Sequence, residues 1–171
     1  KQHGYRLKKR RNKMLKQILK QSSCGKCRIC CGFDESDKWE IPLVFDELKK
    51  LIEERFPDVK LIPRGNEHVF DMQFNGDEVV YCPMLTENGC ILGDDKPFDC
   101  RIWPFRVNDL NGTRVITVSP VCGEVSSLPL SALTEFAEKD GFAQKLFRAA
   151  KAHPDMVKPY ISGYPIIAAE V

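Results

Sequence analysis

The stretch that decides the fold is Cys24-Gly25-Lys26-Cys27-Arg28-Ile29-Cys30-Cys31, which places four thiols within eight residues. The other four of the eight cysteines follow at Cys82, Cys90, Cys100 and Cys122. A single free cysteine packs like a small apolar residue, whereas a cluster of this density is explained by thiol chemistry, above all metal binding. The sequence therefore predicts a protein that holds metal.

Disulfide bonds are the alternative explanation for eight cysteines. We expect a cytoplasmic protein with no transmembrane segment, because the chain has no run of about eighteen apolar residues and its first residues lack the apolar stretch of a secretory signal. A reducing compartment keeps thiols free. The adjacent pair Cys30-Cys31 and the two x2 spacings before it also fit a metal-binding loop better than loop-closing disulfides.

The spacing of the cysteines also indicates which kind of metal centre is bound. Two successive Cys-x2-Cys steps resemble the loop of bacterial ferredoxins, in which a cluster takes three ligands from one loop and a fourth from elsewhere. Four thiolates also suit one zinc ion. Both centres prefer soft thiolates, so zinc stays open as an alternative, although three cysteines at successive x2 spacings favour an iron-sulfur cluster, 4Fe-4S. Neighbouring residues in extended backbone point in opposite directions, so Cys30 and Cys31 are not expected to be equivalent ligands of one ion, and the number of centres is open.

The ordered set of motifs resembles the YkgJ-like cysteine cluster family of zinc- or iron-chelating proteins. The resemblance runs from about Cys24 to Cys122 and includes Cys82-Pro83-Met84-Leu85, Gly89-Cys90-Ile91 and the stretch from Lys96 to Phe105. It implies a metal-chelating domain whose ligands are Cys24, Cys27, Cys30, Cys31, Cys82, Cys90 and Cys100, with Cys122 as a further candidate. One departure is Lys96, since the family often has arginine before this proline, and lysine lacks the planar fork of arginine.

Residues beside Cys100 are candidates for a role at the centre. We expect Arg101 to bind the cofactor, by offsetting the negative charge of a thiolate-rich centre, or to bind an anionic substrate next to it. The alternative is a salt bridge to Asp99 or Asp94. Trp103 and Phe105 are expected to form the wall of the site and to shield it from water.

The hydrophobic pattern predicts a small single domain of the α+β class, with metal-organised cysteine loops, two β-hairpins and packed helices. We expect a helix over 45–56, stopped by Pro57, and a C-terminal helix from about Ser131 that bends at Asp140-Gly141. One hairpin is expected to turn at Asn75-Gly76, and the other to join strands 102–107 and 114–118. Because of their prolines, the last eighteen residues are expected to be irregular.

Charge is distributed unevenly although the formal net charge is only +2. Residues 1–28 carry eleven of the 26 Lys and Arg and no acid, which leaves 15 basic against all 24 acidic residues in the rest of the chain, a net charge of −9. We therefore divide the chain into a basic amphipathic helical arm, residues 1–23, and a cysteine-cluster metal-binding domain, residues 24–171. The apolar face of the arm, with Leu7, Met14, Leu15 and Ile18, either packs on the acidic body or leaves the basic face to contact nucleic acid or an anionic membrane.

Two functions follow from the cysteines. In the first, an iron-sulfur cluster supports electron transfer or a cluster-dependent modification, with an unidentified redox or protein partner. In the second, zinc staples the loops of a binding module whose basic arm holds nucleic acid or a protein. Whether the chain is an enzyme is left open, because it has no nucleotide-binding glycine loop and no serine hydrolase motif.

Overall fold

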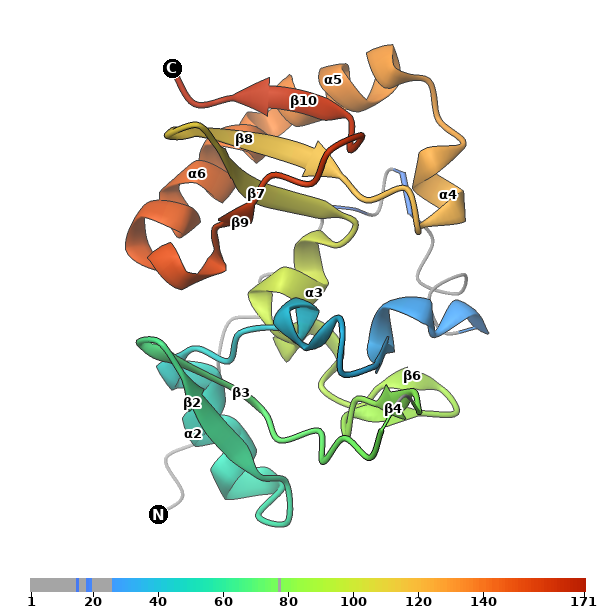
Figure 1. Ribbon diagram of the computed structural model, residues 1–171, viewed down its shortest axis with the longest axis vertical. Coiled ribbons are helices and arrows are strands. Elements are labelled where there is room, and N and C mark those ends of the chain that lie inside the picture. The colour runs from blue at the N-terminus through green and yellow to red at the C-terminus, as the bar shows by residue number, and fades with distance from the viewer. Residues whose placement is uncertain (1–14, 16–17, 20–25, 77) are drawn as a thin grey trace, which may run out of the picture.

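The computed structural model describes residues 15, 18–19, 26–76 and 78–171 (Figure 1). The predicted arm, residues 1–23, falls largely outside the described residues, and so does Cys24. Helices and strands are mixed along the chain, as expected for a small α+β fold. None of the described helices combines the length and the hydropathy that crossing a bilayer would need.

A four-stranded sheet forms the C-terminal half of the fold, with the strand order β10-β8-β7-β9 (Figure 1). Its strands are β7 (Phe105–Leu110), β8 (Thr113–Val118), β9 (Lys158–Pro159) and β10 (Ile166–Ala169). The antiparallel pair β7 and β8 is the second predicted hairpin, with a shorter loop than expected. The turn is Asn111-Gly112, with φ of 53° and 85°. Two positive φ angles are the geometry of the two-residue turn that Asn-Gly favours.

Two helices cover one face of this sheet. Helix α5 (Leu130–Glu138) packs against β10, and α6 (Phe142–Ala152) packs against β7 and β8. The predicted bend at Asp140-Gly141 is confirmed: both residues have positive φ, and the 3-10 turn η4 (Lys139–Gly141) separates the helices. Between helices and sheet, the rings of Phe105, Phe136 and Phe142 lie with centroids 4.8 to 5.5 Å apart, so the core of this half is aromatic.

The prediction that the last eighteen residues are irregular is wrong. They contain η5 (Pro154–Met156) and the strands β9 and β10, which complete the two edges of the sheet. The buried amide of Asn108 donates to the carbonyls of Lys158 and Pro159, and the Thr117 hydroxyl donates to Asn108 Oδ1 at 2.7 Å. Edge strands tolerate proline because one side of the strand needs no N–H donor, so prolines did not exclude strands here.

The other half of the fold contains α2 (Asp46–Arg55) and the hairpin of β2 (Leu61–Arg64) and β3 (Glu67–Phe70). The predicted helix over 45–56 is confirmed. The first predicted hairpin is wrong, because β3 pairs with β2 through Gly65-Asn66 and not with a strand after Asn75-Gly76. A proline inside β2 weakened the strand signal of that segment.

The two halves meet at α3 (Phe98–Ile102), which lies between the sheet and the hairpins in Figure 1. Phe45, immediately before α2, stacks on the ring of His153 at 3.7 Å and on Phe98 at 6.5 Å between centroids. These contacts join the N-terminal half to α3 and to the end of α6. One continuous core of buried apolar residues runs through both halves.

Candidate metal centre

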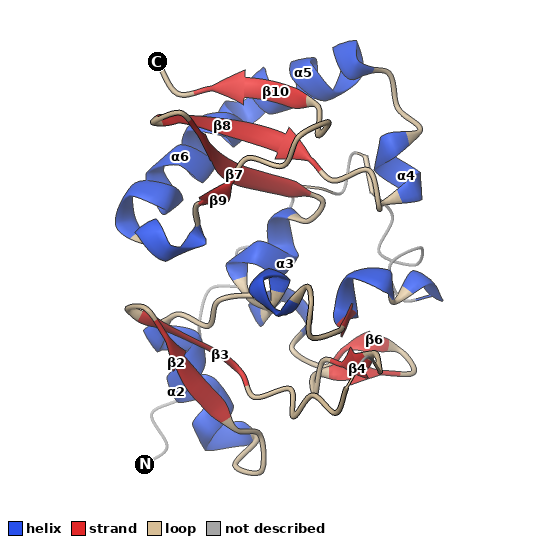
Figure 2. Cartoon of the chain, viewed as in Figure 1, coloured by secondary structure: helices blue, strands red, loops and turns tan. Residues whose placement is uncertain are grey.

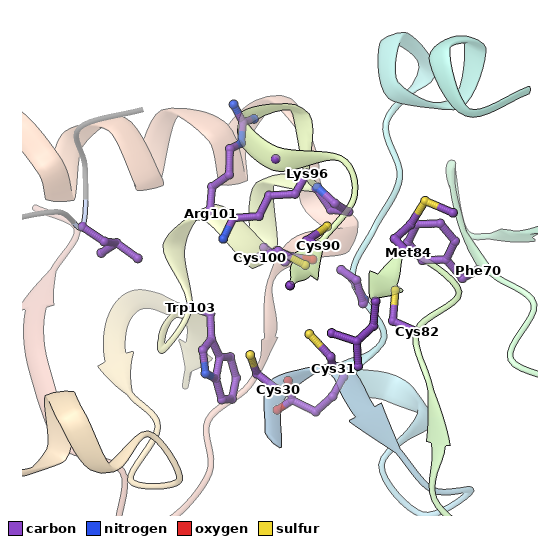
Figure 3. Close-up of a pocket in the computed structure, with 18 of the residues that line it drawn as sticks. Cys30, Cys31, Phe70, Cys82, Met84, Cys90, Lys96, Cys100, Arg101 and Trp103 are labelled. Atoms are coloured by element: carbon purple, nitrogen blue, oxygen red, sulfur yellow. The ribbon is translucent and has the colours of Figure 1, made fainter. Parts of the chain in front are cut away.

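Five cysteines border one cavity of about 190 Å³: Cys30, Cys31, Cys82, Cys90 and Cys100. Figure 3 shows their side chains around this space, carried by segments that are far apart in the sequence. These segments are short helices, two-residue strands and loops (Figure 2). All seven described cysteines are free thiols, so no disulfide forms among them.

Cys31 and Cys82 are brought together by backbone hydrogen bonding. Cys30 and Cys31 lie in the 3-10 turn η1 (Ile29–Cys31), which runs into β1 (Gly32–Phe33). Strand β1 pairs antiparallel with β4 (Val80–Tyr81), and the Cys82 N–H donates to the Cys31 carbonyl at 2.8 Å. This pairing fixes the distance between the adjacent-cysteine loop and the next thiol along the chain.

Cys90 is placed by a second short hairpin. Its strands are β5 (Leu85–Thr86) and β6 (Gly89–Cys90), and Cys90 is the register partner of Leu85. The Leu85 N–H donates to the Cys82 carbonyl at 2.9 Å, so the hairpin starts directly from the Cys82 turn. Cys82 and Cys90 therefore face the cavity from one compact unit.

Cys100 lies in α3, and a buried carboxylate holds this helix in place. The backbone N–H of Leu43 donates to Asp99 Oδ2 at 3.0 Å, and Asp99 is only 7% exposed. Burial raises the pKa of Asp99, an effect partly opposed by that hydrogen bond and by the charge of Lys158. The pair fixes α3 against the segment before α2 and so holds Cys100 at the cavity.

Of the remaining predicted ligands, the structure describes Cys27 and Cys122. Cys27 is exposed, and Cys122 is partly buried just before α4 (Gly123–Ser126); neither borders the cavity. Burial raises the pKa of Cys122, and its electrostatic interactions with Cys30 and Cys27 act in the same direction. Cys24 is outside the described residues.

The pKa values of three cavity thiols, Cys30, Cys82 and Cys100, are raised in the metal-free protein. A hydrogen bond with Cys31, followed by burial, raises the pKa of Cys30. Burial raises the pKa of Cys82 to about 11 and that of Cys100 well above its ordinary value. A metal that binds these sulfurs must displace their protons, so its affinity depends on pH.

Three cationic side chains border the same cavity: Lys96, Arg101 and Arg106. The positive charge of Lys96 acts to lower the pKa of both Cys30 and Cys100, so it favours their thiolates. Arg106 is ion-paired with Glu40, whereas Lys96 and Arg101 form no ion pair within the described part of the chain. Arg101 therefore makes neither of the alternative salt bridges to Asp99 or Asp94.

Of the two aromatic residues expected in the wall of the cavity, Trp103 and Phe105, one borders it. Trp103 borders it, and the Arg106 guanidinium lies over the Trp103 ring, 4.6 Å from the centroid. Phe105 does not border it but is fully buried in the aromatic core of the sheet, which corrects the expected role. Burial lowers the pKa of Arg106 to about 10, so this cation is held in a poorly hydrated position.

Several cavity residues were not predicted from the sequence, namely Lys96 as a charged partner of the thiols, Arg106, Glu40 and the apolar residues Leu15, Leu19, Phe70 and Met84.

Within the described ranges, no three His, Cys, Asp or Glu side chains are arranged so that they could hold one metal ion together. Comparison of the chain with protein-family models, with curated proteins and with solved structures found no match.

Proposed function

We propose that the chain binds an iron-sulfur cluster in this cavity and that the cluster serves a redox reaction or a cluster-dependent modification. Cys30, Cys31, Cys82, Cys90 and Cys100 are the set from which its ligands are drawn. The observation that carries the proposal is that five free thiols from three separate segments border one cavity. The donor set fits, since iron-sulfur clusters are held by cysteine thiolates. The resemblance to the YkgJ-like family agrees with a chelating role.

The size of the cavity favours a cluster over a single zinc ion. Four thiolates at about 2.3 Å from one zinc leave no open space between the sulfurs. An engineered cavity of about 150 Å³ accommodates a benzene molecule. The cavity that the thiols border, about 190 Å³ in volume, is therefore large enough for a centre of several atoms.

Charge balance also favours a thiolate-rich centre. Two of the three cations around the cavity, Lys96 and Arg101, lack an ion-pair partner among the described residues. The charge of Asp95 favours the Arg101 cation, and an anionic group in the cavity would stabilise both cations further. A centre held by four thiolates carries that negative charge.

A bound cluster would supply one-electron transfer at this place. The chain itself contributes the surroundings of the sulfurs. Trp103 and the apolar residues Phe70 and Met84 exclude water from them, and Lys96 and Arg101 place positive charge beside them. Exclusion of water and nearby positive charge both change the potential at which a cluster accepts an electron.

The test is the metal content of two cysteine variants purified without oxygen. We expect the wild-type chain to contain iron and acid-labile sulfide in equal amounts and Cys82→Ser to lose most of both. Cys122→Ser serves as the comparison and should keep its cluster, because Cys122 does not border the cavity. A Cys82→Ser protein with full iron content contradicts the proposal. A colourless wild-type protein with stoichiometric zinc supports the zinc-stapled binding module instead.

A further inference from the structure

The described residues of the N-terminal segment lie over the thiol cavity. Leu15 and Leu19 border it, and both pack with Ile18 against the hydrophobic core. The N–H groups of Ile18 and Leu19 donate to the Leu15 carbonyl at 3.0 and 2.9 Å. These hydrogen bonds hold the three residues close together, and their apolar side chains pack on the body of the protein.

We infer that the side chains of Leu15 and Leu19 form a cover that limits the access of small polar reagents to the cavity thiols. The remaining wall consists of the thiol segments and of residues around Phe70, Met84 and Trp103, all after residue 29 in the chain. Leu15 and Leu19 come from outside these segments and are joined to the cavity by apolar contact. Such contacts open locally at lower cost than the strand pairing and helix packing that hold the other walls. The inference deepens the proposed function, because it concerns access to the sulfurs that would hold the cluster.

Two leucine side chains facing the cavity are well suited to this role. Apolar side chains shield thiols from water, and the raised pKa values of Cys82 and Cys100 have burial as their largest cause. Cys27 is exposed and lies outside the cavity, so the cover should leave it unprotected. The chain therefore provides protected and unprotected thiols in the same molecule.

The test measures the alkylation rate of each cysteine with iodoacetamide, in the full, reduced and metal-free chain, by peptide mass spectrometry. In Leu15→Gln/Leu19→Gln, Cys82 and Cys100 should react about tenfold faster than in the wild type, while Cys27 reacts at an unchanged rate. The matched control is Leu130→Gln, an exposed leucine of α5 that does not border the cavity. It should leave all rates as in the wild type.

If Cys82 and Cys100 were alkylated as fast in the wild type as in the double variant, the inference that Leu15 and Leu19 form a cover would be refuted. If the glutamine pair does not fold, as judged by circular dichroism, Leu15→Ala/Leu19→Ala provides the same comparison with a smaller change. The measurement uses no metal, so it is independent of the proposed function. A wild-type chain without iron would refute the cluster and leave the cover standing, whereas unchanged alkylation rates would refute the cover alone.

Discussion

Single residues determine how the metal-free protein responds to alkaline pH. Burial raises the pKa of Cys82 from 9.0 to about 11, so the native chain keeps a proton that the unfolded chain releases between these values. The contribution of the protonated Cys82 thiol to the free energy of unfolding is fully present below about pH 9 and is lost as the pH rises through about 11. We expect its loss to reach on the order of 2 kcal/mol in the free energy of unfolding.

Urea unfolding of the metal-free wild type and of Cys82→Ala at pH 8 and pH 10.5 checks this expectation. The wild type should lose more stability between the two pH values than the alanine variant does. The metal-bound protein should not show this loss, since a bound thiolate carries no proton in either condition. If the wild type and the variant lost the same amount of stability between the two pH values, Cys82 would not be shielded from water in solution.

Lys96 is the residue whose charge acts on two cavity thiols, Cys30 and Cys100. Lys96→Gln should weaken metal binding by about fivefold, because a partly exposed charge beside a thiolate contributes about 1 kcal/mol. Competition with a chelator measures the affinity. Lys151→Gln, on the exposed side of α6, is the control and should bind as the wild type does. Equal affinities of the two variants would remove Lys96 from the site.

At the scale of elements, the pairing of β1 with β4 connects the fold to the site. A Cβ atom at Gly32 would lie 2.9 Å from Val79 Cγ1 and 3.1 Å from the Tyr81 ring. Gly32→Val should therefore push these strands apart, cost about 1 to 3 kcal/mol and lower the metal content, because the Cys31 to Cys82 hydrogen bond depends on the pairing.

Gly123→Val is the matched control, since a Cβ there meets nothing within 4 Å. It should retain both metal and stability. Metal analysis and thermal unfolding of the two variants make the comparison, and a Gly32→Val protein with wild-type metal content would show that the β1 and β4 pairing does not position the thiols.

Helix α6 is expected to be essential for the stability of the sheet half. Leu146 is completely buried in this helix, and Leu146→Ala should lower the free energy of unfolding by about 2 to 5 kcal/mol because it leaves a cavity. Leu130→Ala removes an exposed leucine, 52% accessible, and should change it by less than about 1 kcal/mol. Denaturant unfolding of both variants distinguishes a packed helix from a loosely attached one.

The elements that could be predicted are those with strong local signals. The apolar spacing around Ile52 predicted α2, and Asn111-Gly112 lies within the loop expected for the second hairpin. Strands β9 and β10 were missed because each has only two to four residues and exists only through pairing with β7 and β8. The turn at Gly65-Asn66 was missed because its strand contains proline.

At the scale of the whole molecule, the sequence predicted the type of donor but not its spatial grouping. The spacing of the cysteines indicated metal, and five of them border one cavity, whereas Cys27 and Cys122 do not border it. Contacts between residues far apart in the chain determine this division, above all Cys31 with Cys82 and Leu43 with Asp99. Such contacts leave no local pattern in the sequence, and the same holds for Leu15 and Leu19.

Whether the cavity holds an iron-sulfur cluster is decided by the iron, zinc and acid-labile sulfide content of the full wild-type chain, purified and analysed without oxygen. We expect a brown protein with iron and sulfide in equal amounts, about four of each per chain, and little zinc. Stoichiometric zinc without sulfide, or a folded protein that holds neither metal, would contradict this expectation.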